Sequence, residues 1–173
     1  MTKTIGLLLV IVLLIFISLF TYHSLFTKKM AYVDIPKVFN SFEMKKELQE
    51  KYKQTEAGRK RVLDSLSFNL QTLAKKINEN KNDKNLIAEF DSQRDMFFKT
   101  KKRFEEDNEV LSRQYDKQIL EQMSQYILDY GKQNRYDLIL GADGNGTLMY
   151  ANEEMNISDL ITNYINNKYK GLE

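Results

Sequence analysis

The chain has 173 residues, and its 26 basic side chains nearly balance its 24 acidic ones, which argues against a nucleic-acid-binding protein because such proteins usually carry a clear basic excess. Cysteine is absent and His23 is the single histidine, so the sequence predicts a protein that is not an enzyme and that holds no metal or cofactor. One proline and seven glycines in the whole chain favour long, uninterrupted regular elements.

Residues 1–29 form an apolar segment with basic flanks. An almost unbroken apolar run extends from Ile5 to Phe20, between Lys3 and Lys28. With its flank the segment is about 22 residues long, close to the ~20 that span a bilayer, and bulky residues occupy the positions where a signal peptidase needs small ones. This segment is therefore either a signal peptide or an uncleaved transmembrane signal anchor.

Residues 30–42 are predicted to form the first segment of a small body. Positions 30–34 are rich in β-forming residues and favour a short strand. Asp34 can then cap the start of a helix, and Pro36 fits the first turn of that helix. A strand followed directly by a helix is expected here.

A long helix is expected over residues 37–78, where only Gly58 departs from helix-forming residues. Its apolar positions follow a heptad spacing that would pack against a partner helix, with Arg59 as a polar interruption. The predicted stripe consists of Leu48, Tyr52, Thr55, Val62, Leu66, Leu70, Leu73 and Ile77, widened by Leu63.

The tip of a helical hairpin is predicted at residues 78–85, which contain four asparagines and no apolar side chain. The return helix is expected over residues 86–130 and should end at Gly131, so that the hairpin arm occupies residues 43–131. Every seventh residue of this helix is apolar, but the alternate seam positions are polar. The apolar set is Phe90, Phe97, Phe104 and Leu111, and the polar set is Arg94, Lys101 and Asn108.

This polar seam has two interpretations. A two-stranded coiled coil is most stable with apolar residues at both seam positions, so the arm is either a thin seam with solvated flanks or a loose arm that offers apolar surface to a ligand. A basic cluster over residues 99–103 is followed by acids over residues 105–109. Salt bridges between residues four apart explain both runs, and contact with lipid headgroups or an acidic ligand is the alternative.

Residues 132–173 form the second body segment. A strand is predicted over residues 136–141, a tight turn at the Asp-Gly-Asn-Gly sequence of residues 143–146, and a second strand over residues 147–151, which together make a β-hairpin. Ser158 or Asp159 is expected to open a final helix. The apolar face of that helix would consist of Leu160, Ile161, Tyr164, Ile165 and Tyr169.

The body is predicted to assemble with other copies of itself. Without the first segment and the hairpin only about 50 residues remain, and domains that small bury too little surface to be stable on their own. Several bodies sharing one core would resolve this shortage, although the sequence period does not fix the number of subunits. The expected contact residues are Val33, Leu138, Ile139, Leu140, Leu148, Met149 and Tyr150.

Three stretches give the chain a family resemblance: Ala31-Tyr32-Val33-Asp34, residues 136–150, and Asp159-Leu160-Ile161 in the closing helix. With the long charged hairpin between them, the chain resembles the Skp/OmpH family of periplasmic chaperones. The resemblance implies an α+β fold in which a helical hairpin arm stands on a small β body. It also implies a homotrimer whose arms enclose a cavity and hold unfolded outer-membrane proteins without ATP.

The resemblance implies a location in the periplasm of a Gram-negative bacterium, either soluble after signal cleavage or anchored in the inner membrane. Well-known members of the family are strongly basic, whereas this chain is nearly neutral. That difference shifts the expected grip from electrostatic capture toward apolar contact. The residues expected to contact the client flank the seam of the arm and are Leu63, Phe97, Phe98 and Phe104.

The alternative function is a membrane-anchored coiled-coil scaffold or adaptor of the cell envelope. A scaffold would bind one folded partner, whereas a holding chaperone would keep several unrelated unfolded proteins from aggregating.

Overall fold

The structure is a computed structural model that describes residues 13–18 and 28–172. Residues 13–18 are helical. The predicted signal peptide or anchor falls largely on residues 1–12 and 19–27, which lie outside the described residues, so that prediction stays open. In the part of the chain that is described, no helix combines the length and the apolar character needed to cross a membrane.

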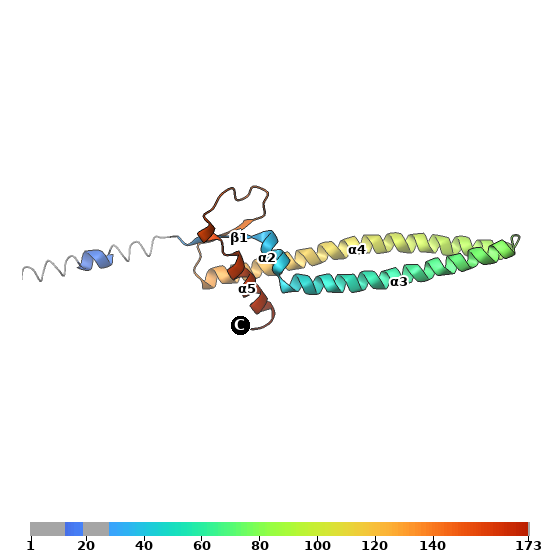
Figure 1. The fold of residues 1–173 in the computed structure, drawn as a ribbon, viewed down its shortest axis with the longest axis horizontal. Coiled ribbons are helices and arrows are strands. Elements are labelled where there is room, and N and C mark those ends of the chain that lie inside the picture. The colour runs from blue at the N-terminus through green and yellow to red at the C-terminus, as the bar shows by residue number, and fades with distance from the viewer. Residues whose placement is uncertain (1–12, 19–27, 173) are drawn as a thin grey trace, which may run out of the picture.

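Two long helices form an arm that projects from one end of a small body (Figure 1). This arrangement confirms the predicted helical hairpin on a body that contains a small sheet. The body holds both strands, the two short helices and the far end of one arm helix. In chain order the elements are β1 (Met30–Asp34), α2 (Ile35–Ser41), α3 (Glu43–Glu79), α4 (Lys84–Gln133), β2 (Leu138–Ala142), the 3-10 helix η1 (Glu153–Met155) and α5 (Ser158–Tyr169).

The start of the body forms as its sequence predicts. The Asp34 carboxylate accepts a hydrogen bond from the backbone N–H of Lys37 at 2.9 Å, and Pro36 lies in the first turn of α2. This side-chain cap satisfies one of the N–H groups that a helix start leaves without a partner. Local chemistry therefore determines where β1 ends and α2 begins.

The expected uninterrupted helix over residues 37–78 is wrong, because the chain breaks at Phe42. The backbone of Phe42 is extended, with φ −75° and ψ 127°. Its side chain is fully buried, with the ring edge-on to Tyr126 and Tyr169 at centroid distances of 6.2 and 5.5 Å. Burial of an aromatic side chain in the body outweighs the modest helix propensity of the neighbouring residues.

The second arm helix is longer than predicted. It begins at Lys84, where the Asp83 carboxylate accepts from two backbone N–H groups, and it continues through Gly131 to Gln133. Gly131 was expected to end the helix but is buried inside it. A Cβ there would lie 3.2 Å from the Ile139 side chain, so this glycine serves close packing of helix against strand.

The predicted β-hairpin of the second body segment is also wrong. The turn forms, with Gly144 and Gly146 at φ 78° and 90°, but residues 147–151 form no strand. Asp143 accepts hydrogen bonds from the Asn145 N–H and the Thr147 hydroxyl, and this local turn competes with strand pairing. Instead β2 pairs with β1 in parallel, with Met30 opposite Leu138 and Asp34 opposite Ala142.

The closing helix α5 completes the core of the body. Ile161, Tyr164 and Ile165 are buried as predicted, but Leu160 is 55% exposed and lies off that face. The helix begins at Ser158, as predicted, and the buried Ser158 hydroxyl accepts a hydrogen bond from the Asp34 N–H and donates one to the Asn156 side chain. The core joins β1, α2, α5 and the root of α4, and its fully buried side chains include Val33, Val38, Phe42, Met123, Ile161 and Ile165.

Candidate functional site

The arm is held together by one narrow seam between α3 and α4. On α3 the seam follows most of the predicted stripe, from Leu48 to Leu73, which are the two buried residues of this helix. Val62 does not belong to it, because Val62 is 47% exposed while Leu63 is half-buried. The seam therefore shifts by one residue after Arg59, and Leu63 takes the place that the heptad spacing assigns to Val62.

A polar layer lies in the middle of this seam. As predicted, Arg59 interrupts the apolar stripe, and its guanidinium donates a hydrogen bond to the Asn108 side chain of α4. The same guanidinium lies over the Phe104 ring at 5.6 Å and within 3.7 Å of the Asp107 carboxylate. A polar pair that is satisfied in this way tolerates partial burial, and it favours one register of the two helices.

Arg94 and Lys101 were expected in the seam of α4, and this is wrong. Their side chains are 48% and 51% exposed, while Gln93 and Thr100 are the half-buried residues. A charged side chain that can reach solvent avoids the cost of desolvation. The seam therefore remains polar at alternate positions, but with neutral residues.

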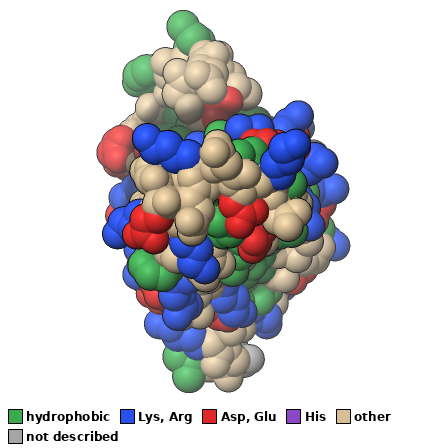
Figure 2. All heavy atoms as spheres, turned by 90° about the vertical axis from the view of Figure 1, so that its right-hand side faces the viewer, with side chains coloured by type: hydrophobic (Ala, Val, Ile, Leu, Met, Phe, Trp, Pro, Cys, Tyr) green, Lys and Arg blue, Asp and Glu red, His purple; other side chains and the backbone are tan. Residues whose placement is uncertain are grey.

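Charged side chains of α4 lie outside the seam and form ion pairs along the surface of this helix. Lys101 lies 3.9 Å from Glu105, Lys102 3.8 Å from Glu106, and Arg94 3.0 Å from Asp91. This confirms the expected lattice of salt bridges between neighbouring turns. In the view onto the tip of the arm, basic and acidic side chains are interspersed, with apolar side chains between them (Figure 2). Exposed pairs of this kind add at most ~1 kcal/mol each to stability.

Large apolar side chains nevertheless lie on the outside of the arm. Phe68 on α3 is 68% exposed, and Phe98 on α4 is 58% exposed with its ring edge-on to Phe97 at 5.5 Å. Phe68 and Phe98 are the largest exposed apolar side chains of the arm, and contiguous apolar surface marks sites that bind other molecules. The other large apolar residues that are exposed on the two arm helices are Val62, Ile87, Met96, Val110, Leu120 and Leu128.

The four residues expected to contact a client occupy three different places. Phe98 is exposed, Phe97 lies half-buried in the seam, and Leu63 and Phe104 line an open hollow between the helices. Phe68 was missed, although the sequence contains a signal for it. It stands between the seam residues Leu66 and Leu70, where a solvated helix face would carry a polar side chain.

The body carries a second apolar surface around β2. Leu138 and Leu140 point the same way along the strand and are 43% and 42% exposed. Met149 and Tyr150, in the loop after β2, are 88% and 86% exposed. Of the other expected contact residues, Ile139 and Leu148 are half-buried, whereas Val33 lies in the core of its own chain.

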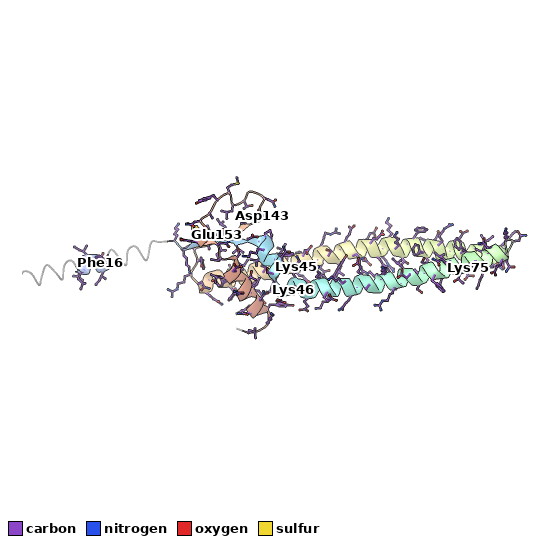
Figure 3. All side chains as sticks on the ribbon, viewed as in Figure 1. Phe16, Lys45, Lys46, Lys75, Asp143 and Glu153 are labelled. Atoms are coloured by element: carbon purple, nitrogen blue, oxygen red, sulfur yellow. The ribbon has the colours of Figure 1, made fainter. Side chains whose placement is uncertain are left out.

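A hollow beside β2 extends this apolar surface onto α4. Its lining includes Ile35, Ile127, Leu128 and Leu138. The loop that follows β2 runs from Asp143 to Glu153 on the outside of the body (Figure 3). It lies at the opposite end of the molecule from Lys75, which is close to the tip of the arm. The outer edge of β2 has no strand partner among residues 13–18 and 28–172.

Tyr169, at the end of α5, is held against the first turn of α3. Its hydroxyl donates a hydrogen bond to the Glu47 carboxylate at 2.5 Å, and this bond, followed by burial, raises the pKa of Tyr169 to about 12. Because the pKa lies above its ordinary value of 10.0, the contact stabilises the fold fully below pH 10.0 and is lost as the pH rises through about 12.

We expect Tyr169 to ionise at a higher pH than the exposed tyrosines, and substitution of Glu47 by glutamine to lower its pKa toward 10.0. Nuclear magnetic resonance of the tyrosine ring carbons across an alkaline titration measures this, with Tyr169→Phe assigning the signal. Ionisation of Tyr169 together with the exposed rings would contradict the contact.

Comparison with known proteins identifies both the sequence family and the fold. The OmpH-like family of outer membrane proteins matches residues 29–165. A crystal structure of a candidate OmpH-like outer membrane chaperone from Caulobacter crescentus CB15 aligns with a TM-score of 0.71 and 13% identity, over 82% of this chain and 86% of that chain. At that identity the likeness shows a shared fold. No curated protein matches the chain.

Proposed function

The chain belongs to the OmpH-like family of outer membrane proteins, and on that premise we propose that it is a periplasmic chaperone that holds unfolded outer-membrane proteins without ATP. The observation that carries the proposal is the exposure of Phe68 and Phe98 on an arm whose own seam needs neither of them. An unfolded β-barrel protein exposes many apolar side chains, and those groups can pack against such rings.

The charge pattern of the arm supports apolar rather than electrostatic holding. Basic side chains such as Lys101, Lys102 and Arg113 already face carboxylates four residues away. A client with an acidic surface would have to compete with these partners. Individual apolar contacts are weak, but several arms around one client add their contacts through a high effective concentration.

We further propose that three copies associate through the surface around β2, so that three arms surround one cavity. The exposed Leu138, Leu140, Met149 and Tyr150 support this, as does the outer edge of β2, which pairs with no strand in the part of the chain that the structure describes. Residues 147–151 are rich in β-forming side chains, so we expect them to form their strand on a neighbouring subunit. The number of copies rests on the family resemblance.

The test is whether the full chain prevents aggregation. Several unrelated outer-membrane β-barrel proteins are diluted from urea with or without the chain, in the absence of ATP, and light scattering is followed. We expect suppression near one assembly per client, and none from a folded coiled-coil protein of similar length and charge. Capture of a single folded partner with no protection of any unfolded protein would overturn the proposal in favour of a scaffold or adaptor.

A further inference from the structure

The two helices of the arm join the body in different ways. α4 continues without a break from the tip into the body, where it ends at Gln133. α3 begins at Glu43, immediately after the break at Phe42, and α2 leaves in another direction (Figure 1). The position of α4 is therefore fixed by a continuous helix, whereas the root of α3 depends on side-chain contacts.

One side chain of α5 spans the break. The Asn166 side-chain oxygen accepts a hydrogen bond from the Glu43 N–H at 2.8 Å, and its amide nitrogen donates to the Ser41 carbonyl at 3.1 Å. The residue before α3, Phe42, supplies no side-chain cap of its own. Asn166 therefore takes the role of a helix cap, from a helix more than a hundred residues away in sequence.

The next residues on the same face of α5 continue the contact. Tyr169 donates to Glu47 and places its ring 5.5 Å from the Phe42 ring centroid, and Lys170 lies 3.9 Å from Glu43. Positions three and four residues apart share one face of a helix. The last turn of α5 thus meets the first turn of α3 along one line.

The seam next to this contact is incompletely packed. A hollow between the arm helices is lined by Leu48 and Tyr52 of α3 and by Tyr115 and Ile119 of α4, together with four polar residues, Lys45, Gln49, Ser112 and Asp116. Leu48 and Ile119 are buried parts of the core cluster. Any separation of α3 from α4 at the root would open this hollow into a cleft and expose the apolar side chains of Leu48 and Ile119 within it.

We propose that the last turn of α5 is a latch, formed by Asn166 and Tyr169, whose opening lets the root of α3 move away from α4 and exposes the cleft at Leu48 and Ile119 to apolar segments of a client. The latch itself rests on the fold. Its use in holding clients rests on the proposed function.

The latch is tested without any client by amide hydrogen exchange of the full chain. In Asn166→Ala the amides of residues 43–52 should exchange about tenfold faster than in the unmodified chain, as expected for the loss of one or two hydrogen bonds. Amides at the tip of the arm should not change. The matched control is Asn163→Ala, an exposed asparagine on the same helix. Equal exchange in both variants would overturn the latch.

A second variant replaces the contact between Tyr169 and Glu47 by a covalent link that can be opened. The chain contains no cysteine, so Glu47→Cys with Tyr169→Cys can be joined by a reducible bis-thiosulfonate linker. The linked form should exchange residues 43–52 more slowly than the reduced form, and equal rates would overturn the latch.

The same linked chain tests the use of the latch by clients. We expect reduction of the linker to increase the affinity for an unfolded β-barrel protein severalfold. Affinity that does not change on reduction, in a chain that does hold clients, would overturn the role of the latch in holding and leave the exchange result standing. A chain that holds no client in either form would refute the proposed function alone.

Discussion

Replacement of both Phe68 and Phe98 by serine will weaken the holding of an unfolded β-barrel protein by at least about tenfold, since each buried phenylalanine contributes ~1.5–3 kcal/mol. The two substitutions remove little packing energy from the free chain, because Phe68 and Phe98 are already 68% and 58% exposed. The stability of the arm should therefore change by less than about 1 kcal/mol. Light scattering of diluted client and fluorescence titration of a labelled client measure the loss.

The matched control for this variant is Leu160→Ser. Leu160 is 55% exposed on α5, so the same change of an apolar to a hydroxyl side chain is made away from the arm. It should leave holding intact, and circular dichroism should show equal helix content in all three proteins. Full holding by the Phe68 and Phe98 variant would contradict apolar holding by the outside of the arm.

Replacement of Leu138 and Leu140 by lysine will convert the assembly into single chains. Both side chains lie on one face of β2 and are 43% and 42% exposed in the single chain, so a neighbouring subunit would cover them together. Burial of two unpaired ammonium groups at such a contact costs several kcal/mol, which exceeds what a small interface can offset. Multi-angle light scattering should show the mass of three chains falling to that of one.

Ile87→Lys provides the control for this second variant. Ile87 is 40% exposed, but it lies on the arm, far from β2 in the fold. The same kind of substitution there should leave the mass of the assembly unchanged. Holding should also fall in the dissociated variant, because a single arm lacks the added contacts of its neighbours. An undiminished mass after both leucines are replaced would contradict the assembly surface.

Local chemistry explains what could be predicted from the sequence. The cap at Asp34, the proline in the next turn and the asparagine-rich tip act within a few residues, so the sequence identifies them directly. The heptad spacing likewise predicts a hairpin. Each seam residue of one helix contacts mainly the residues directly opposite it on the other helix, so the spacing of apolar residues alone shows that the two helices pair. The prediction is wrong by one residue at Val62 and Leu63, because a helix of 3.6 residues per turn drifts relative to a strict seven-residue repeat.

The features that could not be predicted depend on distant contacts. Nothing near Phe42 in sequence stops a helix, and the break comes from rings of α4 and α5 that surround its side chain. The missing strand at residues 147–151 has the opposite cause. Its side chains favour a strand, but the hydrogen bonds that Asp143 accepts from Asn145 and Thr147 form a local turn that leads the segment away from the outer edge of β2. Of the candidate site, Phe98 was identified and Phe68 was not.

The pairing of β1 with β2 has a consequence for the order of folding. The backbone N–H of Lys29 donates a hydrogen bond to the Asp137 carboxylate across 108 positions of sequence, so β1 is synthesised long before β2. Closing so long a loop at random is entropically costly and slow. The arm shortens the search, because its helices can zip together from the tip and carry the two distant ends of the hairpin to the same place. Pairing of the two arm helices would thus also bring the body's own strands together.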